Sequence, residues 1–507
     1  MDERVRKVVI VGRDAAAWIT ALALQSSFGR KDPAVEVHLV EMTSALRPQD
    51  SYLTLPAQQA LHRLLGLDEN RLLRAARGLF SLGQRFSYWS GGDSAYLHAY
   101  DTHGISLSHV AFYQYWLKAR AQGMGVALED FSLGAAAAKQ GCYVAFNDST
   151  RAFSKAAYGY NLSALSYLAA IGKVALDSGL THSLGQPASV EVRDGRIRSI
   201  KLRDGARVDG DLFIDASGPE GRLIRHLEPE DNIHNWRPWL PCNRLMVASA
   251  PVLQPIPAFN QVSAFRHGWI STVPLLDRTV LMAGYESSAI SDDEMLHTVS
   301  ALSGLRIEGD AVADHSAPGA RQLQWIGNCV ALGETAASLD PLDATHLHLL
   351  QTGLSWLIAL FPVNRRNMPE AAEFNQQMAA HTRGVRDFQA AHFKLYRRFG
   401  EPLWDAVREQ EPPESLARKL RLFKARGVVA MDENETFQEE NWTSIFNGQG
   451  LEPDSWDPQV DRIPDQELMA HFQKILGFIA SEVQSMPSLQ AHLEMNRPQS
   501  QSDYIFG

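Results

Sequence analysis

The chain has 507 residues, of which 48 are Lys or Arg and 58 are Asp or Glu, for a formal net charge of −10. An acidic balance without a basic run argues against a nucleic-acid partner, and three cysteines without paired spacing argue against a disulfide framework or a cysteine-based metal site. No apolar stretch reaches the ~18 residues of a membrane span, and the first strand follows the N-terminus too closely for a signal peptide, so we predict a cytoplasmic protein without a membrane partner.

The first predicted elements have the order of a dinucleotide-binding site. Lys7–Val11 reads KVVIV, a short buried strand that Gly12 ends, and Ala15–Leu24 opens a helix. A second strand, Val35–Val40, ends in Glu41. In a dinucleotide site the acid after the second strand accepts ribose hydroxyls, which is the role we predict for Glu41. An exposed acid at a strand end is the alternative.

The glycine-rich motif of this site departs from its usual form at one position. The pattern G-x-G-x-x-G reads GRDAAA here, so Gly12 and Ala17 keep the first and third positions and Asp14 takes the second. A glycine there lets the backbone approach a pyrophosphate, whereas a carboxylate adds bulk and negative charge. We therefore expect weak or lost cofactor binding. Two other interpretations stay open: Asp14 caps the helix, and Arg13 offsets the charge at the pyrophosphate.

The middle of the chain combines helical periodicity with turn signals. Leu53–Ala76 and Tyr160–Asp177 are predicted helices. Asp-Gly pairs at 194–195 and 204–205 separate alternating runs, which predicts an antiparallel meander.

Two further apolar strands end in turns of polar residues and glycine. Leu212–Ile214 runs into Asp215 and Gly218, which we expect near the cofactor, with a tight turn as the alternative. Cys329–Leu332 ends in Gly333 and is followed by Asp340-Pro341-Leu342 and a predicted helix at 346–360. Strands that alternate with helices predict an α/β fold with the four apolar strands in one parallel sheet.

Strand signals nearly vanish from about Val363 onward, where helical stretches alternate with Pro-containing turns. We predict two parts: an α/β core with an inserted substrate lobe over residues 1–362, and a helical cap over residues 363–507.

Taken in order, these segments resemble the flavin-dependent tryptophan halogenase family. The segments that carry the resemblance are Trp18 after the glycine loop, 212–218 (LFIDASG), 325–341 (WIGNCVALGETAASLDP), 360–362 (LFP), 383–397 (RGVRDFQAAHFKLYR) and 442–450 (WTSIFNGQG). The resemblance implies a glutathione-reductase-like FAD-binding core, with Gly12, Arg13, Ala17, Glu41, Asp215, Gly218, Gly333 and Asp340 at the cofactor. It also implies that reduced flavin comes from a separate reductase.

The catalytic positions implied by the resemblance have changed here. In the family, reduced FAD and oxygen oxidise a halide, the hypohalous acid reaches a lysine, and a glutamate assists substitution on the aromatic ring. The lysine pattern F-K-x-G-x-x-F reads FSLGQRF, which puts Ser81 in the lysine position, and a hydroxyl cannot supply an ammonium charge. The glutamate corresponds to Asp343, with the start of a helix as its alternative role. The halide contacts at Thr-Gly correspond to Thr345 and His346.

Two more family signatures are incomplete. The Trp-x-Trp-x-Ile-Pro motif reads WISTVP from Trp269 to Pro274, and the flavin-side loop at Pro48–Thr54 lacks its glycine. Trp269 and Phe265 line the substrate pocket in one interpretation and belong to the core in the other. His346 and His348 lie on different faces of a helix, so no metal site is predicted.

Two functions follow from this degenerate active site. The first is an FAD-dependent, monooxygenase-like oxidoreductase acting on an aromatic or indole-like small molecule or on a peptide-borne tryptophan, with halogenation doubtful because of Ser81. The second is a catalytically inactive binding or accessory protein with weak or lost FAD. A flavin reductase is the expected partner of the enzyme, and a homodimer stays open.

Overall fold

The structure is a computed structural model that describes residues 3–29, 35–92, 94–107, 109–143 and 157–495. The chain divides into two units, each assembled from three separate stretches of sequence. Unit 1 comprises residues 1–78, 162–237 and 316–383, and unit 2 comprises residues 79–161, 238–315 and 384–507. The predicted boundary between residues 362 and 363 stays a prediction.

The four predicted apolar strands lie in one six-stranded sheet of unit 1, in the order β20-β21-β12-β1-β2-β8. β1 pairs in parallel with β2 and β12, and β12 pairs in parallel with β21, which confirms the predicted sheet. Its strands are β1 (Lys7–Gly12), β2 (Glu36–Glu41), β8 (Thr181–Leu184), β12 (Leu212–Ala216), β20 (Trp325–Ile326) and β21 (Cys329–Ala331). The central strands read as near-continuous apolar runs because both faces of this sheet are covered.

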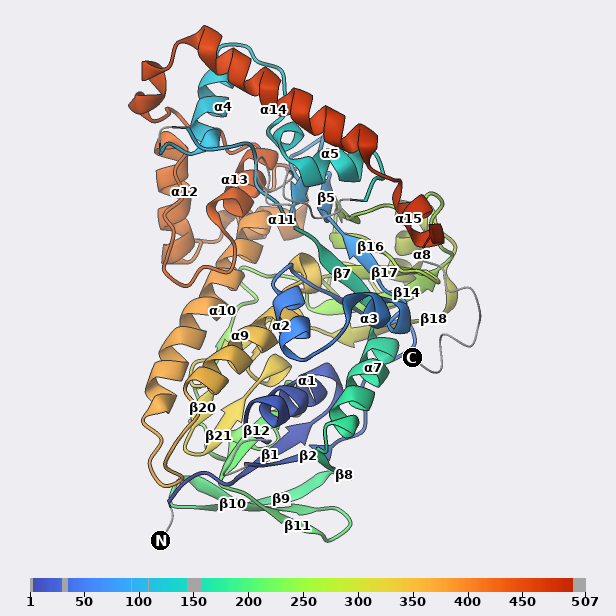
Figure 1. The fold of residues 1–507 in the computed structure, drawn as a ribbon, viewed down its shortest axis with the longest axis vertical. Helices are drawn as coiled ribbons and strands as arrows, with labels where there is room; N and C mark the ends of the chain where they lie inside the picture. The colour runs from blue at the N-terminus through green and yellow to red at the C-terminus, as the bar shows by residue number, and fades with distance from the viewer. Residues whose placement is uncertain (1–2, 30–34, 93, 108, 144–156, 496–507) are drawn as a thin grey trace. The chain divides into compact units, whose positions relative to one another are not determined.

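Helices cover one face of this sheet and the predicted meander covers the other. α1 (Asp14–Leu24) packs on β1 and β2 and contacts α7 (Ala164–Asp177) and α9 (His346–Ala359) (Figure 1). On the opposite face, Val9 and its neighbours share an apolar cluster with Ile200 of the meander. The meander is antiparallel, as predicted, and consists of β9 (Pro187–Arg193), β10 (Arg196–Leu202) and β11 (Arg207–Asp209).

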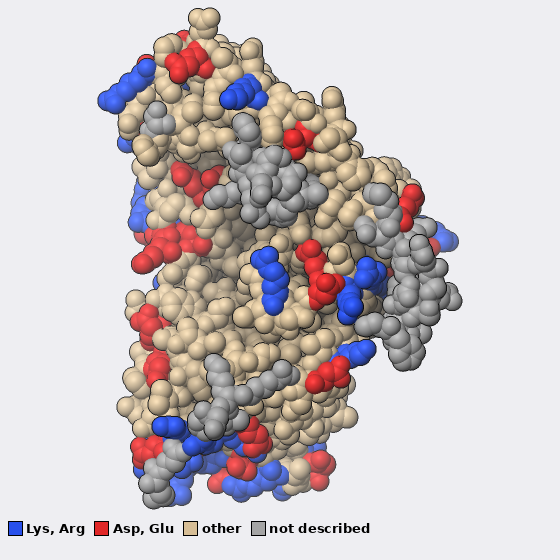
Figure 2. Space-filling model, in the orientation of Figure 1, with Lys and Arg blue, Asp and Glu red and all other residues tan. Residues whose placement is uncertain are grey.

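Basic and acidic side chains alternate on the meander. Figure 2 shows Lys and Arg at this end of unit 1 interleaved with Asp and Glu. Arg207 pairs with Glu191 at 2.7 Å and Arg198 with Asp194 at 3.5 Å. Exposed pairs of this kind add little stability, but they leave no field of one sign over this surface.

The predicted helix over Leu53–Ala76 is wrong as a single element. Gly66 adopts φ +72° and interrupts it, and Asp68 then caps a new helix through its side chain. The segment contains β3 (Ser51–Leu53), α2 (Gln58–Leu64) and α3 (Glu69–Ala75). The helix predicted from Tyr160 begins only at Ala164, because the preceding residues form β7 (Gly159–Ser163). The other short elements of unit 1 are η1 (Gln25–Gly29), η3 (Ile224–His226), β13 (Ile233–Asn235), β19 (Gly319–Arg321), η4 (Gly333–Thr335), β22 (Ala337–Ser338) and η5 (Pro341–Asp343).

Unit 2 is built on a seven-stranded sheet in the order β18-β14-β17-β16-β15-β5-β6. Only β15 and β5 pair in parallel within it. Its strands are β5 (Gly83–Ser87), β6 (Ala95–Ala99), β14 (Arg244–Ala250), β15 (Asn260–Phe265), β16 (Gly268–Pro274), β17 (Thr279–Tyr285) and β18 (Glu308–His315). β4 (Leu79–Ser81) pairs with β7 outside this sheet.

Helices account for every named element after residue 363 in the described chain, as the loss of strand signals predicted. α10 (Glu370–Lys394) runs through the boundary at residues 383–384. The helices that belong to unit 2 alone are α4 (Phe112–Ala121), η2 (Leu128–Phe131), α5 (Leu133–Lys139), α8 (Asp292–Ser303), α11 (Pro402–Glu409), α12 (Glu414–Arg426), α13 (Glu439–Gly448), η6 (Pro458–Arg462), α14 (Asp465–Ser485) and α15 (Leu489–Met495). Within the described ranges, no helix is both long enough and apolar enough to cross a bilayer.

Candidate functional site

Three turns meet where β1, β12 and β21 end, at the carboxyl edge of the parallel sheet. A Cβ at Gly12 would lie 2.5 Å from the carbonyl oxygen of Ala216, and the amide of Arg13 donates to that oxygen at 3.2 Å. Gly333 adopts φ +62°, and a Cβ there would lie 2.9 Å from the Cβ of Ala16 in α1. Both close approaches therefore require glycine, and they bring backbone to the first turn of α1.

The turn after β12 is bonded to the turn after β21. The amide of Gly218 donates to the Thr335 hydroxyl oxygen at 3.0 Å, and that hydroxyl donates to the Gly218 carbonyl at 2.9 Å. Gly218 adopts φ +100°, and a Cβ there would collide with the guanidinium of Arg13. Arg13 in turn pairs with Glu220 at 3.4 Å. The three predicted cofactor segments are thus joined by direct contacts between their turns.

Asp14 keeps the backbone path of the glycine that it replaces. Its φ is +59°, in the left-handed region that glycine favours and that Asp tolerates better than most residues. The expectation that Asp14 caps the helix is wrong, because Arg13 is the N-cap and Asp14 is the first helical residue. Its carboxylate accepts instead from the Ser44 hydroxyl at 2.5 Å and the Ala45 amide at 3.2 Å. The loop after β2 therefore holds the negative charge.

Glu41 is held by two aromatic donors that the sequence did not predict. Trp18 Nε1 donates to Oε1 at 3.1 Å, and His182 Nε2 donates to Oε2 at 2.8 Å. The Glu41 side chain stays 23% exposed, so each oxygen retains a lone pair that a ribose hydroxyl could use. The Trp18 and His182 rings lie 5.1 Å apart and fix the carboxylate between them.

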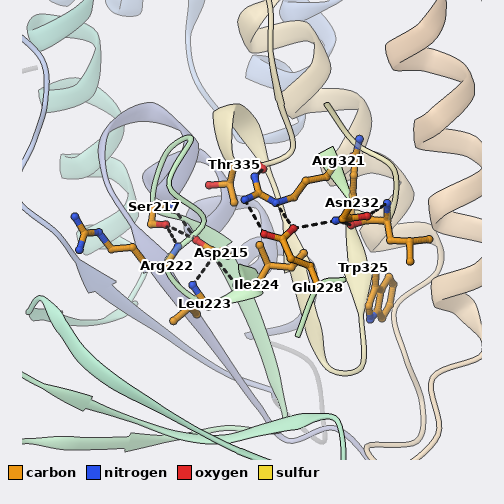
Figure 3. A network of polar contacts seen from close by, with 12 residues as sticks. Asp215, Ser217, Arg222, Leu223, Ile224, Glu228, Asn232, Arg321, Trp325 and Thr335 are labelled. Carbon is orange, nitrogen blue, oxygen red and sulfur yellow. Dashed lines mark hydrogen bonds and ion pairs between the residues drawn. The ribbon is translucent and has the colours of Figure 1, made fainter. Parts of the chain in front are cut away.

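Asp215 is fully buried and organises its own turn (Figure 3). Its Oδ1 accepts from the amide and hydroxyl of Ser217 at 3.1 and 2.6 Å. Its Oδ2 accepts from the amides of Leu223 and Ile224 at 2.7 and 2.9 Å. Four bonds from one loop fit the tight-turn interpretation, in which Asp215 shapes the path that ends in Gly218.

A tyrosine that sequence reasoning missed lies beside the first turn of α1. Tyr52 is 8% exposed and stacks on His346 with ring centroids 5.8 Å apart. Burial, reinforced by the charge of Asp14, raises the pKa of Tyr52 well above its usual range, while a hydrogen bond from the backbone of Ala15 acts in the opposite direction. A neutral phenol therefore lies among the groups that meet at this helix terminus.

Four of the predicted site residues lie in the turn before α9 or at the first position of that helix. Asp340 accepts from the Leu342 amide at 3.2 Å and caps the short helix η5, and Asp343 is 2% exposed. Thr345 is the N-cap of α9, and among described atoms its buried hydroxyl lacks a hydrogen-bond partner. His346 Nδ1 lies 3.8 Å from Glu334 Oε1. The described residues contain no cluster of three side chains suited to a metal ion.

The remaining predicted residues lie in unit 2. Ser81 is 1% exposed and donates its hydroxyl to the Gly83 carbonyl at 3.1 Å. Trp269 is fully buried, and a Cβ at Gly284 would lie 2.5 Å from its indole nitrogen. Phe265 belongs to the apolar cluster of the seven-stranded sheet. Both aromatic side chains have the burial of core residues, and their contact with a substrate stays a prediction.

The residues of the three turns fit an adenine dinucleotide. The positive end of the α1 dipole lies at these turns and favours a negatively charged group, and Gly12 and Gly333 allow the close packing that brings the turns together. The feature that opposed this fit was the charge of Asp14, and the structure directs that carboxylate toward Ser44 and Ala45.

The chain is similar to one protein-family model and to several known proteins. The model of the tryptophan halogenase family matches residues 7–465. BrvH, a flavin-dependent halogenase from Brevundimonas sp. BAL3, is 32% identical with a TM-score of 0.90, over 97% of this chain and 100% of that one. Xcc4156, a flavin-dependent halogenase from Xanthomonas campestris, is 28% identical with a TM-score of 0.92, over 98% and 99% of the two chains. Tryptophan 7-halogenase RebH from Lentzea aerocolonigenes is 23% identical over 97% of this chain and 99% of its own length.

Proposed function

Since this chain belongs to the tryptophan halogenase family, we propose that it is an FAD-dependent oxidoreductase acting on an aromatic, indole-like substrate. The observation that carries the proposal is the meeting of three glycine-containing turns at the first turn of α1, with Gly333 against Ala16 and Gly218 bonded to Thr335. When bound, reduced FAD delivered by a separate flavin reductase supplies, with oxygen, the oxidising power of the reaction.

Each part of the candidate site has a role in holding this cofactor. The dipole of α1, whose positive end lies at these turns, attracts the pyrophosphate. Glu41 accepts ribose hydroxyls with the lone pairs that Trp18 and His182 leave. Gly12 and Gly333 let the turns pack against Ala216 and against the first turn of α1, and the guanidinium of Arg13 lies over the Gly218 turn.

The residues at the family's catalytic positions favour oxygen transfer over halogenation. Asp343 supplies a carboxylate that can take up a proton from an aromatic ring, as the resemblance implies for its position. Ser81 supplies a hydroxyl, which can neither form a chloramine nor provide a positive charge. Thr345 and His346 occupy the family's halide position, with an imidazole where the family has a glycine. A monooxygenase-like reaction needs neither a lysine nor a halide.

We expect the purified protein, reconstituted with FAD and gel-filtered, to be yellow, with absorbance bands near roughly 370 and 450 nm. With a flavin reductase, NADH and an indole, we expect a product that carries one added oxygen. Gly12→Val is the negative control, because the new side chain would collide with Ala216 at the turn that carries the proposal. Its folding is checked by circular dichroism. A wild type that stays colourless at saturating FAD would contradict the proposal.

Replacing Asp14 by glycine is expected to tighten FAD binding about tenfold or more, because removing one opposed charge contact is worth about 1–3 kcal/mol. Glycine also adopts φ +59° without strain. Ser44→Ala should have the opposite effect, since it removes the donor that holds the carboxylate. Asp14→Asn, which loses only the charge, should lie between. The measurement is FAD titration by fluorescence, and equal or weaker binding by Asp14→Gly would show that the loop has another role.

A further inference from the structure

A buried ion pair lies behind the turns of the candidate cofactor site. The side chains of Arg321, at the end of β19, and Glu228 are only 5% and 11% exposed. Arg321 Nε donates to Glu228 Oε2 at 2.8 Å and its Nη2 donates to Oε1 at 3.2 Å, so the pair is bidentate (Figure 3). Such geometry holds a guanidinium in one orientation.

The third nitrogen of the guanidinium reaches the turn after β21. Arg321 Nη1 donates to the carbonyl of Thr335, and the Arg321 amide donates to the Ala336 carbonyl at 2.9 Å. On its other side the guanidinium lies against Gly221, where φ is +52° and a Cβ would collide with it. Arg321 therefore fills the space between the turn after β12 and the turn after β21.

Glu228 is itself held in place. Asn232 Nδ2 donates to Glu228 Oε2 at 2.9 Å, while Asn232 Oδ1 accepts from the Leu323 amide at 2.9 Å. Burying two charges costs more than packing apolar side chains of similar volume, so stability alone is a weak reason for such a pair. What the ion pair does provide is a fixed position for Thr335.

Thr335 links the ion pair to the turns of the candidate cofactor site. Its hydroxyl makes both hydrogen bonds that join it to Gly218, and it ends the η4 turn that begins at Gly333, against Ala16 of α1. We propose that Arg321 and Glu228 are positioning residues for the cofactor: they hold the Gly333–Thr335 turn so that it and the Gly218 turn meet the first turn of α1. This inference rests on the proposed FAD-dependent function.

The test compares FAD affinity and the flavin spectrum in matched variants. We expect Arg321→Met to weaken FAD binding at least about tenfold and to shift or broaden the 450-nm flavin band, since a displaced turn changes the cofactor's surroundings. Arg321→Lys keeps the charge but loses the bidentate geometry, so its affinity should be intermediate. The control is Arg386→Lys, because Arg386 and Asp387 form a comparably buried pair in unit 2, with side chains 9% and 2% exposed. It should leave FAD affinity and spectrum unchanged.

A double-mutant cycle tests whether Arg321 and Thr335 affect FAD binding through the same turn. Thr335→Val removes the hydroxyl bonds to Gly218 while keeping the side-chain shape. Combined with Arg321→Met it should lose little more FAD affinity than either single change, because both act on one turn. Additive losses, or a normal FAD affinity and flavin spectrum in folded Arg321→Met, would overturn the inference. A wild type that binds no FAD would instead contradict the proposed function.

Discussion

Incubated with free tryptophan, FAD, a flavin reductase, NADH and bromide, the protein is expected to give no single brominated regioisomer. The Ser81 side chain is buried and donates to the Gly83 carbonyl, so no ammonium group is present at the lysine position. His346 adds an imidazole at the position to which the resemblance assigns the halide contacts, and it stacks on Tyr52. Since we propose that Asp343 accepts a proton from the ring, we expect the block to lie upstream, in delivery of the oxidised halogen.

Mass spectrometry of the tryptophan pool measures this outcome. Any bromination should be slow and scattered over ring positions, as expected from hypohalous acid in solution. Ser81→Lys alone should not restore the reaction, because the other altered positions act together with it. A single brominated isomer that disappears in Asp343→Asn would overturn the prediction and show that another group replaces the lysine.

The folded protein is also expected to be unusually sensitive to acid. Burial lowers the pKa of His62, His103 and His348 to about 4 and the pKa of His98 to about 3. In the unfolded chain these histidines take up protons near pH 6.5. Between pH 6.5 and about 4 the unfolded state therefore binds more protons, and the free energy of unfolding falls as the pH falls. Each histidine removes about 1.4 kcal/mol per pH unit, so a typical stability of about 5–15 kcal/mol would be largely lost by about pH 4–5.

Urea unfolding at pH 8, 6 and 5 measures this loss. His62→Gln removes one of the four groups, and it replaces the imidazole that contacts the Tyr167 hydroxyl at 2.8 Å with another polar side chain. Its free energy of unfolding should depend on pH less steeply than that of the wild type, by at most about one quarter. His297→Gln is the control, because His297 is exposed on α8 and should leave the slope unchanged. A free energy that stays constant from pH 7 to pH 5 would contradict the prediction.

The parallel sheet could be predicted from sequence because local signals determine it. β1, β12 and β21 contain unbroken apolar runs that end in glycine or a polar turn, and the meander is marked by two Asp-Gly pairs. The segment at 53–76 was misassigned because its apolar periodicity runs through Gly66, whose positive φ divides it. Local periodicity also could not show that Tyr160 begins in a strand, which pairs with residues about 80 positions earlier.

The sequence predicts the backbone turns of the candidate site better than it predicts the partners of the charged side chains. The glycine positions carried a pattern that can be read locally, and the structure brings Gly12, Gly218 and Gly333 together. The partners of the charged groups could not be found this way. Ser44 lies 30 residues from Asp14, and Glu228 lies 93 residues from Arg321. Such pairs depend on the assembled turns, and no short motif identifies them.

The order in which the chain is made has a consequence for its assembly on the ribosome. β1 emerges before most of its sheet, because β21 follows more than 300 residues later and unit 1 continues to residue 383. At about 5–20 residues per second, the first strand waits roughly 20–80 s for its last neighbours. During that interval apolar strands that are finally buried on both faces are exposed at open edges. We therefore expect nascent chains to be vulnerable to aggregation until residue 383 has emerged, so that chaperone supply and translation speed affect the yield of folded protein.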